Sequence, residues 1–449
     1  MKHPMVKISA LSASIFAASS AMAGGFDNSS RGFDIIYGDN NVITTSYGQT
    51  KVPMKAKIQQ EAGSSNIVAS GEILDDFTRP QLGTRYHVAE NVSCALQYEV
   101  PFKAGVEYKD DTLAYGTTSA PIRTVYDSES LTAACGYDIA LSTGVLKVFG
   151  GPKLQKVSGS FTEDLLTDAF GLTDSSDNLA VELDGGTEAG FIAGMSFSIP
   201  EIALRASILY HSQIDYTATG TINSIIPDQN AAINLAFGTE FQTTGKAKTF
   251  TPQSVELALQ SGIAEDTLAF IKMRWSEYGK LAELQVQGGN DGISGTDNTN
   301  LGGDGSEVTL QQLAALSENA DALINPNVGM FSNDTFDYSF GLGRRINDQL
   351  SLGASFSGSI KLGGKSSDTP VGADSTSLRL PGDTSHTLSF GGEYAVMPNL
   401  KVNGGFGYTF INDYVVQTKA DEDTGVSAYR AEFSKTEATS FQLGLTYEI

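Results

Sequence analysis

Apolar and polar residues alternate over several stretches of about ten residues, most clearly in the C-terminal half of the chain. In the stretch 350–360 the even positions are apolar except for Gly358, and the odd positions are serine or glycine. The same split recurs in 336–346, 386–396, 400–410 and 441–449. A period of two predicts β-strands, and strands of this length are typical of a transmembrane β-barrel with its apolar face to lipid and its polar face to the lumen.

The connections between these segments alternate between short turns and long loops, as expected for such a barrel. Short turns are predicted at 140–144, 198–201, 264–266, 347–349 and 397–399. Roughly fourteen strands follow from this count; they start near Val42, Phe77, Val92, Ile122, Val145, Gly190, Ile202, Ser254, Thr267, Phe336, Leu350, Ser385, Leu400 and Ser440. The alternative is a soluble two-sheet sandwich, which usually has shorter strands and more balanced turns.

The N-terminus has the form of an export signal. Lys2 and Lys7 precede an apolar run over 8–18, and Ala21-Met22-Ala23 has the small-x-small form of a cleavage site. We therefore predict a signal peptide over 1–23. No later apolar run reaches the length of a transmembrane helix, so the mature chain is expected to cross a membrane by strands.

Composition agrees with an all-β membrane protein. The chain has 48 Gly, 23 Phe and 17 Tyr with only 18% charged residues, which suits sheets with aromatic rims. The formal net charge of -23 argues against nucleic acid or an anionic membrane surface as a partner, because both need clustered Lys and Arg.

One strand is interrupted. The alternation that begins at Val92 ends at Pro101, whose ring removes a backbone donor. Proline within a sheet belongs at an edge or a bulge. Since a closed barrel has no edge, Pro101 predicts a place where two neighbouring strands part. The alternative is that the strand has already left the membrane at this residue.

Three segments resemble the FadL/TodX family of outer-membrane transporters for long-chain fatty acids and other hydrophobic compounds. They are 84–108, 131–161 and 250–281, and the last ends in the specific series Arg274-Trp275-Ser276-x-Tyr278. The resemblance implies a fourteen-stranded barrel, an N-terminal hatch in the lumen, external loops that capture the ligand, and a kinked third strand that opens sideways. No cofactor is implied.

On this basis we divide the mature chain into a hatch over 24–41 and a barrel over 42–449, with long external loops at about 162–187, 221–251 and 282–334. The hatch is shorter than is usual in the family and lacks its Asn-Pro-Ala motif. Phe26 and Phe33 are expected to help fill the lumen. The alternative for this segment is a flexible exported terminus.

The resemblance places the lateral opening at Pro101, Phe102 and Gly105. A bulge at this point would use one bulky and one permissive residue, and Phe102 and Gly105 supply them.

The predicted ligand contacts are apolar residues of two external loops: Leu165, Leu166 and Phe170 at helical spacing in the first, and Ile225, Ile226, Leu235 and Phe237 in the second. Exposed apolar patches of this kind suggest capture of an apolar ligand. The alternative is that the loops pack on one another and cap the barrel. Asp291, Asp297 and Asp304 do not have the spacing of an EF-hand loop, so a solvated acidic loop is favoured over a metal site.

Catalytic signatures are weak. Only His87, His211 and His386 remain after signal removal, and there is no Gly-x-Ser-x-Gly elbow, so we predict neither an enzyme nor a catalytic site. Cys94 and Cys135 fall on the outward register of adjacent strands, where either a disulfide or two free thiols would fit.

These observations predict passive uptake of a hydrophobic molecule by a monomeric barrel in the outer membrane of a Gram-negative bacterium, with outer-membrane lipid as its surroundings. The alternatives are a diffusion porin for small polar solutes and a barrel-based surface receptor or adhesin.

Overall fold

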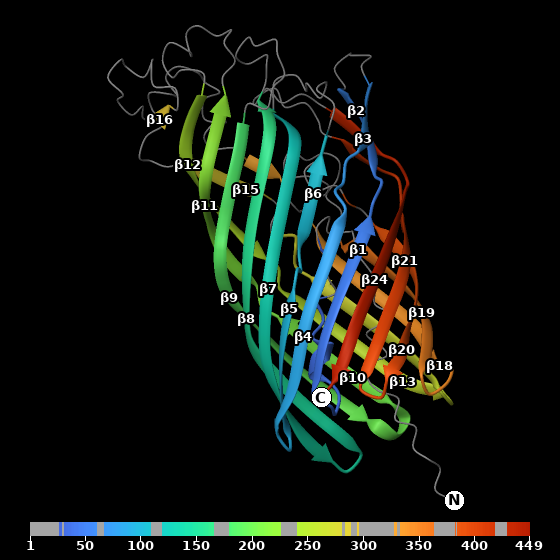
Figure 1. Ribbon diagram of the computed structural model, residues 1–449. Coiled ribbons are helices and arrows are strands. Elements are labelled where there is room, and N and C mark those ends of the chain that lie inside the picture. The colour runs from blue at the N-terminus through green and yellow to red at the C-terminus, as the bar shows by residue number, and fades with distance from the viewer. Residues whose placement is uncertain are drawn as a thin grey trace, which may run out of the picture.

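The structure is a computed structural model that describes residues 27–28, 31–60, 67–108, 119–165, 179–225, 240–280, 283–288, 294–295, 327–329, 333–362, 382, 384–417 and 429–449. Strands account for nearly all of these residues (Figure 1). In chain order the elements are η2 (Asp34–Ile36), β1 (Val42–Lys51), β2 (Lys55–Gln60), β3 (Ile67–Glu72), β4 (Phe77–Ala89), β5 (Val92–Glu99), β6 (Lys103–Glu107), β7 (Ser119–Leu141), β8 (Gly144–Leu165), β9 (Leu179–Ile199), η3 (Pro200–Ile202), β10 (Leu204–His211), β11 (Ile214–Ile225), β12 (Glu240–Thr251), β13 (Ser254–Ala264), β14 (Thr267–Ser276), β15 (Glu283–Gly288), β16 (Ser294–Gly295), β17 (Asn327–Gly329), β18 (Asp334–Arg345), β19 (Leu350–Leu362), β20 (Ser385–Met397), β21 (Leu400–Ile411), β22 (Tyr414–Gln417), β23 (Tyr429–Phe433) and β24 (Thr436–Glu448).

The long strands form a closed antiparallel barrel of 14 wall strands, as the sequence predicts. Four wall strands are interrupted and appear as two segments each: β5 with β6, β10 with β11, β12 with β13, and β14 with β15. They are the third, seventh, eighth and ninth wall strands. The first strand pairs with the last from Val42–Glu448 to Lys51–Thr439, and this pairing closes the barrel.

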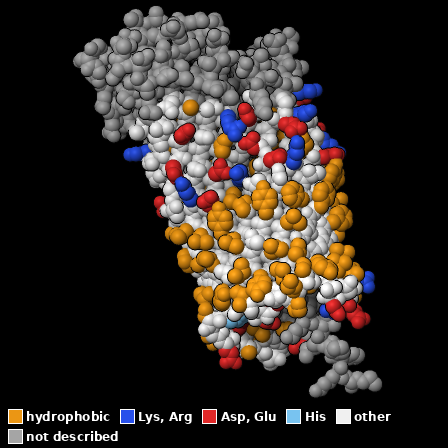
Figure 2. Space-filling model, in the orientation of Figure 1, with side chains coloured by type: hydrophobic (Ala, Val, Ile, Leu, Met, Phe, Trp, Pro, Cys, Tyr) orange, Lys and Arg blue, Asp and Glu red, His pale blue; other side chains and the backbone are white. Residues whose placement is uncertain are grey.

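The two faces of the wall follow the predicted alternation. Large apolar side chains such as Leu82, Phe390 and Leu443 are more than half exposed on the outside, at 53%, 60% and 60%. Their inward neighbours are small and polar; Ser355 and Ser389 are buried. Figure 2 shows the outward side chains as an apolar belt, with acidic and basic side chains above it. The belt is the surface that lipid would cover.

The strands extend further than the sequence predicts. Loops were expected at 162–187, 221–251 and 282–334, but strands occupy part of each range: β8 runs to Leu165, β9 begins at Leu179, and β12 begins at Glu240. The expected helical turn over 163–172 therefore begins as strand. Beyond the apolar belt neither face of a strand contacts lipid, so the sequence there need not alternate between apolar and polar residues. Backbone pairing nevertheless continues, and these parts of the strands are not visible in the sequence pattern.

A second, four-stranded sheet of β22, β23, β2 and β3 stands at the external end of the barrel. Its base packs on a buried apolar cluster that includes Met54, Ile73, Phe77, Val106 and Phe433. Because Ile73 and Val106 belong to this cluster, the upper part of the third wall strand is attached to the external sheet.

A disulfide joins Cys94 of β5 to Cys135 of β7, which are directly opposite in register. Of the two alternatives left open by the sequence, the structure has the bonded pair. It links the third and fourth wall strands below the interruption at Pro101. Among the residues described, no helix has the length and apolar character needed to span a membrane.

Candidate functional site

The third wall strand contains a bulge at Pro101. From Glu99 to Lys103 the chain advances four residues, whereas its partner β7 advances three, from Ser130 to Asp127. One extra residue exchanges the inward and outward faces of a strand. Phe102 is thereby turned into the lumen, where 1% of its surface is exposed.

On its other side the bulged strand parts from β4. Pairing runs up to Gln81 with Glu99 and is restored by a single bridge between Leu74 and Val106. Apart from the two bonds of this bridge, from Asp75 N–H to the Gly105 carbonyl and from Glu107 N–H to the Ile73 carbonyl, no backbone hydrogen bond joins the two strands above Gln81–Glu99 among the residues described. Pro80 and Pro101 flank this stretch, and neither has an N–H to donate. We call the unpaired stretch, Phe77–Pro80 facing Val100–Lys103, the first gap.

Gly105 lies just above the first gap for a steric reason. A Cβ at this residue would lie 2.1 Å from a carboxylate oxygen of Asp75, which crosses from the second wall strand. The backbone N–H of Asp75 donates to the Gly105 carbonyl at 2.9 Å, and Arg123 binds both Asp75 at 3.1 Å and Glu107 at 2.9 Å. These contacts hold the upper end of the gap together.

The N-terminal segment fills the first gap. The Asn28 N–H donates to the Pro101 carbonyl at 2.9 Å, and its Nδ2 donates to the carbonyls of Thr78 at 2.9 Å and Val100 at 3.3 Å. Asn28 therefore reaches both strands that have parted and supplies donors that they do not supply to each other.

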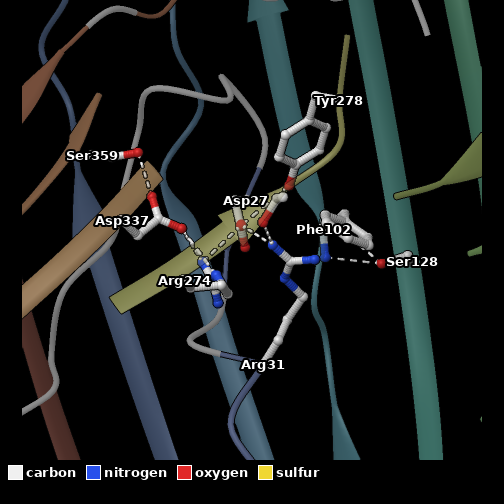
Figure 3. Close-up of polar contacts among 9 residues, drawn as sticks. Asp27, Arg31, Phe102, Ser128, Arg274, Tyr278, Asp337 and Ser359 are labelled. Atoms are coloured by element: carbon white, nitrogen blue, oxygen red, sulfur yellow. Dashed lines mark hydrogen bonds and ion pairs between the residues drawn. The ribbon is translucent and has the colours of Figure 1, made fainter. Parts of the chain in front are cut away.

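Asp27 places a carboxylate among three donors in the centre of the lumen (Figure 3). Its Oδ2 accepts hydrogen bonds from Arg31 at 2.8 Å, from Arg274 at 3.0 Å and from the Tyr278 hydroxyl at 3.1 Å. All four side chains are buried. A buried carboxylate is tolerated when opposite charges and hydrogen bonds replace its hydration.

The network continues into the opposite wall. Arg274 of β14 also donates to Asp337 of β18, at 2.9 Å from Nε and 2.7 Å from Nη2, and Asp337 accepts from Ser359 of β19. Arg274 pairs with Asp337, and Arg31 pairs with Asp27. The charges of the two guanidinium groups and the two carboxylates therefore balance.

Arg31 lies between two aromatic rings. Its guanidinium carbon is 5.1 Å from the centroid of Phe102 and 6.0 Å from that of Tyr278, within the range of a cation–π contact. The two rings meet edge to face at 6.5 Å. Phe102 comes from the third wall strand and Tyr278 follows β14 of the ninth. We call Phe102, Arg31 and Tyr278 the cross-bar, because together they span the lumen between two distant walls.

The backbone at Arg31 is strained, with φ +47° in a residue other than glycine. Such a conformation costs about 1–2 kcal/mol and persists where surrounding contacts fix it. Ser276 accepts a further hydrogen bond from Arg31 at 2.8 Å.

Below the cross-bar, the N-terminal segment packs on the inner wall. Phe33, Ile36 and Tyr37 form one buried cluster with inward side chains that include Phe149 and Leu209. The aliphatic residues of η2 thus replace water in this part of the lumen.

An ion-pair cluster fixes η2 to two wall strands. Lys272 of β14 lies 2.9 Å from Asp34 and 3.3 Å from Glu256 of β13. Burial raises the pKa of Asp34, but the charges of Lys272 and Arg205 outweigh burial and hold this pKa below its usual value. Asp34 is therefore a carboxylate at neutral pH.

Tyr37 sits beside this cluster with its ring 4.2 Å from the Arg205 guanidinium carbon. Burial and the neighbouring Asp34 carboxylate raise the pKa of Tyr37 to about 12, so that its hydroxyl stays protonated.

Arg85 of β4 closes the network at the end of the barrel where the chain enters β1. It donates to the backbone carbonyls of Ile35, Tyr37 and Asn40, and is itself 1% exposed. One wall residue thus binds three backbone carbonyls within and just after the 3-10 helix.

The structure brings some of the predicted site residues together and leaves others outside. Pro101, Phe102 and Gly105 lie together at the first gap, and Phe33 is buried in the lumen. Leu165 and Ile225 end strands β8 and β11. The other predicted loop residues and Phe26 lie outside the described residues: Leu166, Phe170, Ile226, Leu235 and Phe237.

Sequence reasoning missed the charged centre of the site. Asp27, Asn28 and Arg31 were absent from the predicted residues, as were Arg274 and Tyr278 as side chains with a role. One signal could have found Arg274: it shares the inward register of β14 with Lys272, and charges inside a wall strand need partners in the lumen.

A closed barrel with an apolar belt, whose lumen is crossed by its own N-terminal segment, belongs to the class of membrane transport barrels. The family of outer membrane transport proteins described as OMPP1/FadL/TodX matches residues 16–449, so this chain belongs to the FadL/TodX family. The resemblance inferred from the sequence is thereby confirmed. Comparison with curated proteins found no match.

Solved structures share the fold at low identity. A Pseudomonas aeruginosa FadL homologue has a TM-score of 0.68 at 13% identity, covering 95% of this chain and 96% of that one. The toluene transporter TodX of P. putida has a TM-score of 0.57 at 13% identity and coverage of 92% and 91%. The monoaromatic hydrocarbon channel CymD has a TM-score of 0.53 at 12% identity and 97% coverage of both chains.

Proposed function

We propose that this chain is a monomeric channel through which long-chain fatty acids or similar hydrophobic molecules diffuse passively across the outer membrane of a Gram-negative bacterium. Membership in the family and the apolar belt support this proposal. Similar folds include a toluene transporter and a monoaromatic hydrocarbon channel, so the proposed substrates extend to hydrocarbons.

The proposed route has three steps. Apolar residues of the external loops capture the ligand, namely Leu165, Leu166, Phe170, Ile225, Ile226, Leu235 and Phe237. The ligand then enters the lumen above the N-terminal segment 24–41, which acts as a plug to which Phe26 and Phe33 contribute. Finally it leaves sideways through the first gap, beside Pro101, Phe102 and Gly105. Each buried methylene contributes about 0.8 kcal/mol.

The observation that carries the lateral route is the first gap itself. Two wall strands part there, and the partners described at the gap include Asn28 and, through its bridge with Phe102, Asp27, which belong to the N-terminal segment and not to the wall. A side-chain amide can leave without breaking the barrel, whereas a wall strand cannot.

The direct route along the barrel axis is blocked at several levels in the described residues. The cross-bar spans the centre, the apolar cluster of Phe33 and Ile36 fills the lumen below it, and Arg85 fixes the base. A sideways exit requires movement of fewer of these contacts.

The first gap lies at the external margin of the apolar belt. Leu82 is the last largely exposed apolar residue of β4 below the gap, and the ion pair of Lys103 with Asp127 lies directly above it on the outer face. We propose that the ligand leaves into the outer leaflet, where its alkyl part enters lipid and any polar group stays near the surface.

Replacing Pro101 by valine tests this route. Pro101→Val restores an N–H and relaxes the backbone, so that one or two hydrogen bonds across the gap become possible at about 1 kcal/mol each. We expect uptake of radiolabelled oleate and of toluene by cells to fall about tenfold. Pro152→Val is the matched control, because Pro152 lies within β8 and is paired with Phe191 of β9, with further pairs on both sides of it.

Folding of each variant is checked by heat-modifiable migration on gels. Unchanged uptake by a folded Pro101→Val protein would remove the first gap from the proposed route. Failure of the unmodified chain to raise uptake above cells that lack it would remove the proposed function altogether.

A further inference from the structure

The eighth and ninth wall strands also part. Below, they pair from Ala264–Thr267 to Ser254–Ser276, with one further bond from the Glu277 N–H to the Gln253 carbonyl at 3.1 Å. Above, pairing resumes only at Ala247 with Val286. Between these points no backbone hydrogen bond joins the two strands among the residues described.

The extra length in this separation belongs to the ninth strand. From Gln253 to Ala247 the eighth strand advances six residues, whereas the ninth advances nine from Glu277 to Val286. On its other edge the eighth strand keeps an unbroken ladder with the seventh, from Ile214–Thr251 to Ile225–Glu240. The excess length therefore bends the ninth strand away from its neighbour.

The separation repeats the features of the first gap. A proline, Pro252, lies at its lower end and has no N–H to donate. An aromatic residue, Tyr278, begins the excess stretch and is turned into the lumen with 0% exposure. Tyr278 and Phe102 both lie against Arg31, so the two separations end at opposite sides of the same cross-bar.

The outer face of the separation is aromatic. Phe250 and Trp275 have outward registers and are half-buried: Phe250 lies on the eighth strand within the separation, and Trp275 lies on the ninth strand just below it, paired with Val255. Leu257 and Met273 are exposed apolar residues below, and Lys248 is an exposed residue above. Aromatic residues between an apolar and a charged zone mark the level of the membrane interface.

We propose that the separation between Lys248–Pro252 and Tyr278–Lys280 is a second lateral window, through which the hydrophobic ligand passes between the lumen and the outer leaflet. This inference rests on the proposed function. Phe250 and Trp275 form the apolar rim that an alkyl chain or an aromatic ring crosses, and Tyr278 is the inner side chain that must move aside.

A chain of polar contacts on the outer face holds the window closed at its lower end. Tyr210 donates to Gln253 Oε1 at 2.8 Å, and Gln253 Nε2 donates to Glu277 at 2.8 Å. Glu277 is also 2.8 Å from Lys280. The N-terminal segment fills the first gap. This window is instead held closed by hydrogen bonds between side chains of the barrel wall.

The test bridges the window from outside. Phe250→Cys and Lys280→Cys are introduced together and joined with a short bis-maleimide; the native Cys94–Cys135 disulfide keeps those residues from reacting. The control pair is Leu257→Cys with Met273→Cys, which are outward and directly opposite on the same two strands, where the ladder already joins them. Uptake of radiolabelled oleate and of toluene is measured before and after bridging.

We expect bridging at Phe250 and Lys280 to lower uptake and bridging of the control pair to leave it unchanged. In the Pro101→Val background, bridging should remove the uptake that remains. Equal uptake with and without the bridge, in both backgrounds, would overturn the second window. Complete loss of uptake in Pro101→Val alone would also overturn it, while leaving the proposed function and the first gap intact.

Discussion

Asp27 is the residue on which the N-terminal segment and the two opposite walls converge. Three donors, one from the N-terminal segment and two from the ninth wall strand, share one carboxylate oxygen, and all of them are buried. Removing one member of such a buried group leaves the others with uncompensated charge, which is costlier than losing an exposed ion pair.

We therefore expect Asp27→Asn to lower the free energy of unfolding by about 3–5 kcal/mol. Glu72→Gln serves as the control, because the Lys51–Glu72 pair is 3.9 Å apart with both side chains about half exposed, and it should cost less than about 1 kcal/mol. Urea unfolding in detergent micelles measures both. If both variants lowered the free energy of unfolding by a similar amount, water in the lumen would be screening the charge of Asp27.

Asp34 gives the plug a predictable response to acid. Its pKa is held below the usual value because Lys272 and Arg205 outweigh burial. A carboxyl group with a lowered folded-state pKa stabilises fully above its unfolded pKa of about 3.9, and this stabilisation is lost as pH falls through the folded pKa.

The difference in unfolding free energy between the unmodified chain and Asp34→Asn should therefore be constant above about pH 5 and shrink below about pH 4. Urea titrations over this range measure the difference. If it grew towards acid pH, Asp34 would be protonated in the folded protein, and its pairing with Lys272 would be wrong.

At the scale of elements, the closure of the first gap depends on one amide. Asn28→Asp keeps the size of the side chain but removes the Nδ2 donor to Thr78 and Val100. We expect faster backbone hydrogen exchange at Phe102 and Lys103 than in the unmodified chain. Amides of β5 between Cys94 and Gln97, which are paired on both sides, should be unchanged. Equal exchange at all of these positions would mean that Asn28 does not hold the gap.

The two breaks in the wall differ in how visible they are in the sequence. Pro101 interrupts an otherwise regular alternation, so the bulge of the third strand could be predicted from a single missing donor. In the ninth strand β14 is followed by Glu277, Tyr278 and Gly279, a series that resembles an ordinary strand end. The ninth strand bends away because it has more residues between two pairing points than the eighth strand beside it. A local sequence pattern cannot show this difference in length.

The charged contacts within the lumen could not be predicted for a related reason. The pairing of Arg274 with Asp27 joins residues that are far apart in the chain, and it depends on which wall strands face the N-terminal segment. The alternation of apolar and polar residues fixes the inward position of Arg274 but does not identify its partner. Strand starts such as Val42, Phe77 and Leu350 were predictable because lipid imposes the alternation directly.

For the molecule as a whole, the cross-bar separates this barrel from a water-filled porin. We expect no steady conductance from the unmodified protein in planar bilayers. Tyr278→Ala removes one ring of the cross-bar and a donor to Asp27, so it should produce stepwise conductance. Phe340→Ala, which alters an exposed ring on the outer wall, should not. Steady conductance of the unmodified chain would favour the diffusion porin over the proposed transporter.

The barrel closes beside its own N-terminal segment. Residues 31–41 lead directly into β1, and β1 pairs with β24, the last strand of the chain; the Ile449 N–H donates to the Asn41 carbonyl at 2.9 Å. The final seam therefore closes beside the segment that lies in the lumen. During biogenesis the closing pairing step and the docking of residues 31–41 therefore take place at neighbouring positions, so that each can stabilise the other.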